Sequence, residues 1–118
     1  MKLEAVGIQE KSVELSRLND VMKENGLVLA GQWDYERVTY DRKFEFKNEV
    51  YYLRVQGYAV EGDVGSRHAM IQLLTPLLGK HYYPHGVEYG EGEKFPKSLI
   101  EQCDNLLNNV MKEIDALQ

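Results

Sequence analysis

Several features that mark whole classes of protein are missing from this sequence. It contains a single cysteine, Cys103, which excludes an internal disulfide. No apolar run approaches the roughly 20 residues that span a bilayer. The start of the chain also lacks the positively charged and then apolar segment of a secretion signal. We therefore expect a soluble, cytoplasmic protein that makes no use of a membrane.

Basic residues are too few for a nucleic-acid-binding surface. The 14 lysines and arginines are outnumbered by 19 aspartates and glutamates, which gives a net charge of −5. Binding to nucleic acid needs a basic patch or stripe, so this charge argues against it. The hydrophobic content of 43% and the charged content of 28% are ordinary for a globular protein, and we expect residues 1–118 to form one domain.

The sequence also lacks an established catalytic or metal-binding motif. The glycine-containing residues 90–93 have neither the lysine nor the strand-to-helix setting of a phosphate-binding loop. Cys103 falls within an apolar helical stripe, whereas a nucleophilic cysteine needs an exposed, electropositive niche. The spacing of His68, His81 and His85 matches no zinc pattern. These absences favour a protein without a cofactor and without enzymatic activity.

The clearest pattern that is present predicts a β-hairpin in the middle of the chain. Apolar and polar residues alternate with period two on both sides of Lys47 and Asn48, within residues 37–61. A two-residue turn at Lys47 and Asn48 sets Asp41 opposite Arg54 and gathers the apolar side chains on one face, with Arg42 as the exception. We therefore predict this register for the hairpin.

Three further strands are predicted on either side of the hairpin. Residues 2–8 are expected to form an edge strand, and residues 27–33 an extended segment that ends in a turn or bulge near residues 34–36. Residues 67–75 carry apolar side chains on both faces, which indicates a central or dimer-facing strand that ends at Pro76. With the two hairpin strands, the predicted sheet has five strands.

Two helices complete the predicted fold. The first begins after an N-cap at Ser16, or alternatively at Ser12, and ends at Asn25 and Gly26. The second begins either with a capping box at Ser98 or with Pro96 as its first residue. Its apolar stripe comprises Leu99, Cys103, Leu106, Leu107, Val110, Ile114 and Leu117. This order predicts an α+β fold in which both helices cover one face of an antiparallel sheet.

Two stretches of the sequence, residues 32–41 and residues 79–89, resemble the two signature stretches of the YugN-like family of small bacterial proteins. The resemblance covers essentially the whole chain. It implies a TATA-binding-protein-like or helix-grip fold, in which an antiparallel sheet curls around a long C-terminal helix. No functional residue is carried over by the resemblance.

The second of these stretches is the predicted place for a binding site. Residues 80–89 contain a lysine, two histidines, three tyrosines and a carboxylate, and Pro84 and Gly86 introduce a bend. The candidate ligand-binding residues are Lys80, His81, Tyr83, His85 and Glu88. Histidine and tyrosine suit a polar or anionic ligand, and we expect a small recess at the end of the sheet, next to the loop before the last helix. The alternative is a turn satisfied by its own hydrogen bonds, with no ligand.

Three functions follow as hypotheses from these features. The first is a non-catalytic interaction protein that forms a homodimer through the outer sheet face, with Tyr52 and Tyr58 exposed there. The second is a small-molecule-binding protein with a cavity between the sheet and the C-terminal helix. Trp33 and Tyr35 could line such a cavity, although aromatic residues at strand positions more often pack in the sheet. The third is an enzyme centred on residues 80–89.

Overall fold

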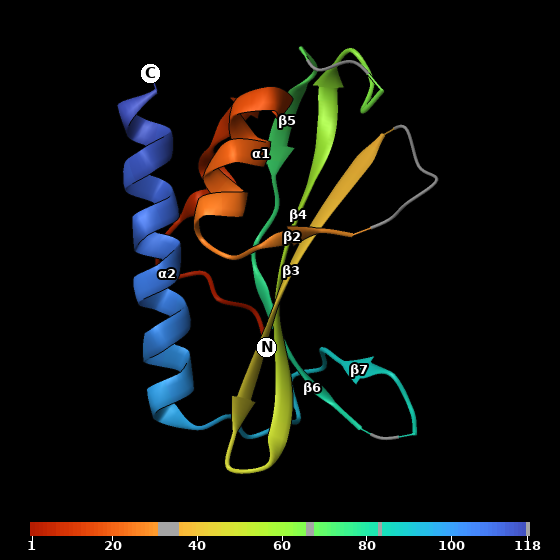
Figure 1. Ribbon diagram of the computed structural model, residues 1–118, viewed down its shortest axis with the longest axis vertical. Helices are drawn as coiled ribbons and strands as arrows, with labels where there is room; N and C mark the ends of the chain where they lie inside the picture. Colours follow the sequence, from red (N-terminus) through yellow and green to blue (C-terminus); the bar gives the residue numbers. More distant parts are fainter. Residues whose placement is uncertain (31–35, 66–67, 83, 118) are drawn as a thin grey trace.

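A computed structural model describes residues 1–30, 36–65, 68–82 and 84–117 of the chain. It contains two α-helices and one antiparallel sheet, which confirms the predicted α+β class. Both helices lie on the same side of the sheet (Figure 1). The helices and strands are, in order, β1 (Ser12–Glu14), α1 (Leu15–Glu24), β2 (Val28–Leu29), β3 (Arg37–Phe46), β4 (Glu49–Glu61), β5 (Met70–Leu73), β6 (Leu77–His81), β7 (Val87–Glu88) and α2 (Lys97–Ala116).

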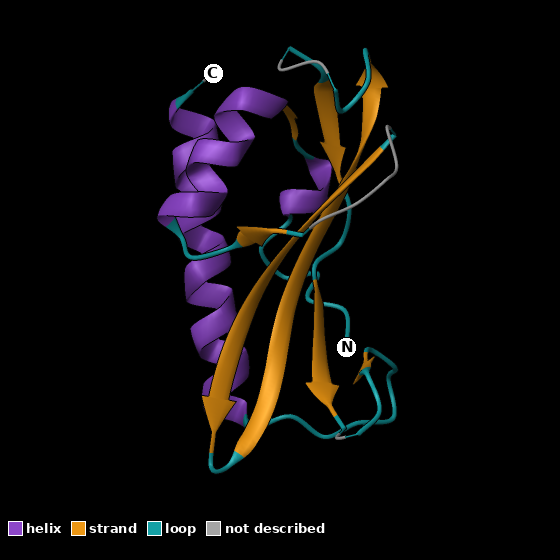
Figure 2. Cartoon of the chain, turned by 45° about the vertical axis from the view of Figure 1, so that its right-hand side comes forward, coloured by secondary structure: helices purple, strands orange, loops and turns teal. Residues whose placement is uncertain are grey.

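The sheet is built around β4, which is 13 residues long. One edge of β4 pairs with β3 over its first ten residues, and β2 follows β3. The other edge of β4 is shared, because β6 pairs with its first part and β5 with its last part. β1 then continues the sheet beside β5, and β7 continues it beside β6. Figure 2 shows the long β3–β4 pair, which joins the part of the sheet containing β5 and β1 to the part containing β6 and β7.

The predicted hairpin register is confirmed. Asp41 pairs with Arg54, and Phe44 pairs with Tyr51. Lys47 and Asn48 form the turn with φ angles of 49° and 66°, the left-handed conformation that favoured two-residue hairpin turns require. The Asp41 carboxylate accepts two hydrogen bonds from the Arg54 guanidinium, at 2.8 and 3.0 Å.

Arg42, the one charged residue on the apolar side of β3, has a partner at the end of α1. Its Nη1 donates a hydrogen bond of 2.8 Å to the carbonyl oxygen of Asn25. Carbonyls at the C-terminal end of a helix have no N–H partner within the helix, so this hydrogen bond satisfies one of them. Its guanidinium also lies over the Phe44 ring, 5.1 Å from the ring centroid. A cation at a helix C-terminus is favourable, so Arg42 joins the sheet to α1 without breaking the hairpin pattern.

The predicted count of five strands was wrong, because the sheet already has seven strands in the described residues. Residues 2–8 form no strand: Gly7 has a φ of 86°, and a 3-10 turn follows at Ile8–Glu10. Lys2 instead makes an isolated bridge to Leu77. The prediction missed β1, β6 and β7, which have three, five and two residues. Strands this short or this polar show no period-two pattern.

The helices occur where they were predicted, but their starts differ. α1 begins at Leu15 after Glu14, so Ser16 lies inside the helix and the alternative start, Ser12, lies in β1. α2 begins at Lys97 after Pro96, and no side chain caps its first turn. The capping box at Ser98 was therefore wrong, and Pro96 precedes the first helical residue instead of being that residue.

The core fills the space between the sheet and the two helices. Most of the predicted helical stripe is buried, including Cys103, and the inward side chains of β3, β4 and β6 complete the core. Trp33 and Tyr35, predicted to pack in the sheet or line a cavity, lie outside the described residues, as does most of the predicted bulge near residues 34–36. In the described part of the chain, neither helix is both long and apolar enough to cross a membrane.

Candidate ligand-binding recess at the end of the sheet

The β6–β7 hairpin places the candidate residues. Lys80 pairs with Glu88 and His81 pairs with Val87, while the backbone N–H of Tyr82 donates a 3.2 Å hydrogen bond to the carbonyl of Gly86. Neighbouring residues of a strand point to opposite faces, so Lys80 and Glu88 share one face and His81 takes the other.

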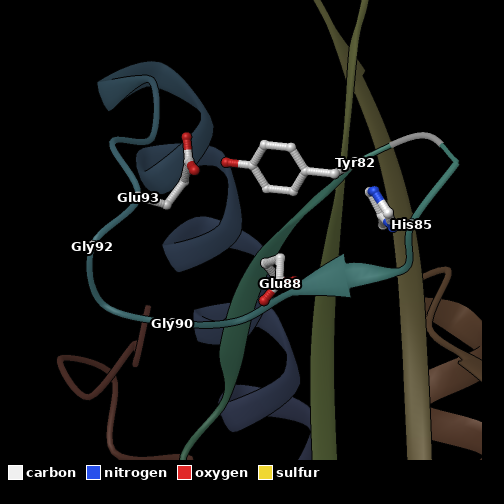
Figure 3. A pocket seen from close by; sticks show the side chains of 6 residues that line it. All are labelled: Tyr82, His85, Glu88, Gly90, Gly92 and Glu93. Atoms are coloured by element: carbon white, nitrogen blue, oxygen red, sulfur yellow. The ribbon is translucent and has the colours of Figure 1, made fainter.

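A recess of about 410 Å³ opens beside this hairpin. Its lining residues come from the hairpin and from the loop that leads to α2: Tyr82, His85, Glu88, Gly90, Gly92 and Glu93. Figure 3 shows the Tyr82 side chain reaching from the hairpin toward Glu93, with Glu88 on the neighbouring wall. The recess thus lies at the end of the sheet and next to the loop before the last helix.

Lys80 supports two walls of the recess. Its ammonium nitrogen is 3.6 Å from a Glu49 carboxylate oxygen and 3.7 Å from a Glu93 carboxylate oxygen. It also lies over the Tyr82 ring, 5.2 Å from the ring centroid. Only 18% of the Lys80 side chain is exposed. Lys80 therefore fixes the positions of Tyr82 and Glu93 relative to the start of β4.

His81 lies apart from the recess. Its ring meets that of Tyr52 edge-on, with 6.4 Å between the centroids and an angle of 84° between the planes. His81 is not among the residues that line the recess. Tyr83 lies outside the described residues. Of the five candidate residues, His85 and Glu88 line the recess and Lys80 holds its walls.

Tyr89 anchors the strand that leads into the recess loop. Its ring lies against Gly79, where an added Cβ atom would be 2.6 Å from the ring. The Arg54 guanidinium covers the ring, 4.9 Å from its centroid. Burial raises the pKa of the Tyr89 hydroxyl, and the nearby Arg54 charge acts in the opposite direction. The hydrogen bond to Asp41 raises the pKa of Arg54, so the group that stacks on Tyr89 stays charged.

The α-ammonium group of Met1 contacts the start of the same loop. It donates hydrogen bonds of 2.9 Å to the Leu78 carbonyl and 2.8 Å to the Tyr89 carbonyl. Burial lowers the pKa of this ammonium group, with Glu91 acting in the opposite direction. Two separate contacts thus fix residue 89, next to Gly90 in the recess wall.

His85 and Glu88 are the chemically available groups of the recess. Both side chains are exposed, and neither makes a hydrogen bond or ion pair with any residue that the structure describes. Within the same described ranges, no group of three or more histidine, cysteine, aspartate or glutamate side chains is arranged to hold a metal ion. The recess can therefore offer an imidazole, carboxylates and a phenol to a small molecule.

Tyr82 and Glu93 are the recess side chains that the sequence interpretation missed. Tyr82 has the same parity as Lys80, which would have placed it beside that residue if β6 had been recognised. Glu93 lies in the glycine-containing loop before α2, for which the sequence predicts no ligand-binding residue. Its contribution depends on the path of the loop, which no local pattern reveals.

Comparison with known proteins gives the family. The model of the YugN-like family matches residues 3–111. The chain belongs to the YugN-like family. It is 52% identical over 118 residues to the uncharacterized protein YlbA of Bacillus subtilis, covering all of this chain and 98% of that protein. It is 31% identical over 96 residues to the uncharacterized protein YugN of the same organism, covering 80% of this chain and 71% of that protein.

A solved structure of the YugN-like family supports the fold. The crystal structure of an uncharacterized conserved protein YugN from Geobacillus kaustophilus matches with a TM-score of 0.86 and 57% identity. The match covers 99% of this chain and 97% of that one. The arrangement of sheet and helices is therefore one that a YugN-like protein adopts in a crystal.

Proposed function

We propose that this YugN-like protein is a non-catalytic binding protein that holds a small polar ligand in the recess at the end of the sheet. The availability of His85 and Glu88 carries this proposal. Both are exposed in the recess and have no partner among the described residues, whereas Lys80 pairs with Glu49 and Glu93 and His81 contacts Tyr52.

The chemistry of the recess favours binding over catalysis. Its described lining residues include no serine, threonine, cysteine or lysine that could act as a nucleophile beside His85. Cys103, the single cysteine of the chain, is buried in the core. An enzyme centred on His81 and His85 would also need the two rings to converge, and His81 instead contacts Tyr52.

The interface between the sheet and α2 is a less suitable place for a ligand. Leu53, Val55 and Leu78 from the sheet are 0% exposed, as are Leu107 and Val110 from the helix, and all five belong to one apolar core cluster. A ligand placed among them would displace close-packed side chains. The open recess needs no such rearrangement.

A thermal-shift screen tests the proposed function. The panel contains divalent metal salts, phosphates, amines, carboxylates and common metabolites. We expect at least one compound to raise the Tm of the wild type and to have no effect on His85→Ala or Glu88→Gln. Both side chains are exposed, so neither substitution should lower the Tm in the absence of ligand. Glu101→Gln, an exposed change on α2, is the control and should respond as the wild type does.

One combination of results would contradict the binding proposal. If no compound shifts the Tm and both His85→Ala and Glu88→Gln lose stability, these side chains serve the turn and the binding proposal is wrong.

A homodimer formed through the outer sheet face is the second candidate function. The exposed apolar side chains Tyr58 (40% exposed), Val60 (49%) and Leu74 (38%) favour it, because they lie in or next to the paired segments of β4 and β5. Tyr52 contributes less than predicted, since it is half-buried and packs against His81. The interface we propose is therefore the β4–β5 half of this face.

A further inference from the structure

Two residues that line the recess, Tyr82 and Glu93, already contact one ammonium group, that of Lys80. The Lys80 nitrogen lies 5.2 Å from the centroid of the Tyr82 ring and 3.7 Å from a Glu93 carboxylate oxygen. An aromatic face combined with a carboxylate is the arrangement that binds organic cations in proteins. Tyr82 and Glu93 both line the recess, so the walls are built from groups that favour positive charge.

Glu88 extends the same chemistry to the part of the recess that Lys80 does not reach. Its carboxylate is exposed in the recess and has no ion-pair partner within the described ranges of the chain. Among the described residues that line the recess there is no lysine or arginine. Because the Lys80 charge is already shared by Glu49 and Glu93, an anionic ligand would face the unpaired Glu88 carboxylate, whereas a cationic ligand would give that carboxylate a partner.

We infer that the ligand of the recess carries an ammonium group, held by the Glu88 carboxylate beside the Tyr82 side chain. This inference rests on the proposed binding function and names the class of ligand. It differs from the prediction made from the sequence, which allowed a polar or anionic ligand because of the histidines and tyrosines in residues 80–89. Figure 3 shows Tyr82, Glu88 and Glu93 around the same hollow.

The size of the recess sets the size of the amine. About 410 Å³ lies in the range of small-molecule sites, and the recess is open on one side. The space around Gly90 and Gly92 is open, since an added Cβ atom at either would meet no atom within 4 Å. A small amine with room for a hydroxyl or second amino group fits this space.

A titration followed by amide NMR signals of the whole protein tests the inference. The probes are ethanolamine, choline and putrescine, with ethylene glycol as the neutral and glycolate as the anionic counterpart of ethanolamine, all at pH 7 and matched ionic strength. We expect at least one amine to cause saturable shifts in the signals of Gly90, Gly92 and Glu93. Ethylene glycol and glycolate should cause no saturable shift.

Two matched variants assign the response to the recess. Glu88→Gln removes the charge from the contact with the ammonium group. We expect this loss to weaken amine binding about tenfold. Glu101→Gln makes the same chemical change on α2 and should leave the affinity unchanged. Amine binding that is equally strong in Glu88→Gln would overturn the assignment.

The remaining outcomes separate this inference from the proposed function. Saturable binding of glycolate without binding of any amine would overturn the ammonium inference and leave the binding function standing. No response to any of the three amines also overturns the inference, while the wider thermal-shift panel decides the binding function on its own.

Discussion

Cys103 is a core residue whose chemistry can be stated from its surroundings. Burial raises the pKa of its thiol to about 12, and the neighbouring Asp104 acts in the same direction. The reactive thiolate is therefore scarce in the folded protein at neutral pH. In the unfolded chain the thiol ionises near its ordinary value of 9.0, so this group favours unfolding increasingly as the pH rises from about 9 toward 12.

We predict that Cys103 is protected in the native protein. Iodoacetamide at pH 8 should label it slowly in the folded state and completely once guanidinium chloride has unfolded the chain. Mass spectrometry gives the labelled fraction in each case. Rapid stoichiometric labelling of the folded protein would contradict the packing described for α2.

Gly79 is the residue on which the position of Tyr89 depends. An added Cβ atom would lie 2.6 Å from the Tyr89 ring and 2.7 Å from Val87, distances that force the β6–β7 pair apart. We predict that Gly79→Ala lowers the free energy of unfolding by about 1–3 kcal/mol. Gly90→Ala adds the same atom where it meets nothing within 4 Å and should change stability little. Urea denaturation of the two variants makes the comparison, and equal effects would mean that Tyr89 does not cover Gly79.

The β3–β4 hairpin and α2 provide a test of which side chains face inward. The Asp41 and Arg54 side chains are partly exposed, at 22% and 33%, so Asp41→Ala should cost at most about 1 kcal/mol. Leu106 is buried in the stripe of α2, and Leu106→Ala should cost roughly 2–5 kcal/mol. Denaturant midpoints of the two variants measure the difference, and similar losses would refute the assignment of the two faces.

How far each element could be predicted depends on its length and pattern. The β3–β4 hairpin and α2 were predicted because ten or more residues repeat one pattern, period two in the first and helical spacing in the second. The two residues of β7 are too few to show a period. Residues 2–8 looked like a strand by composition, yet the positive φ of Gly7 turns the chain before a strand can form.

At the scale of the whole molecule, the composition of the sequence pointed to residues 80–89 as a candidate segment, but it could not predict which of their side chains lie together. The concentration of histidine and tyrosine in residues 80–89 is a local property. Which of these side chains meet depends on the pairing of β6 with β7 and of β6 with β4. The contribution of Glu93 and the support from Glu49 are long-range contacts that no spacing in the sequence encodes.

Self-association is also a property of the whole molecule. If the β4–β5 half of the outer face forms a twofold interface, sedimentation equilibrium at tens of micromolar should show a dimer. Tyr58→Glu places a charge among the exposed apolar side chains and should convert that dimer to a monomer. Glu101→Gln on α2 is the control and should remain dimeric. A wild-type monomer would remove this candidate, and a dimer insensitive to Tyr58→Glu would place the interface elsewhere.

The occupancy of the recess is the most direct test of the central claim. Native mass spectrometry of the protein purified gently from its own cells should reveal a small bound molecule on the wild type and on Glu101→Gln. That additional mass should be lost from His85→Ala and Glu88→Gln, because these substitutions remove the available groups of the recess. A bound molecule that persists equally in all four proteins, or wild type that carries none and binds nothing in the thermal-shift panel, would contradict a binding function at this site.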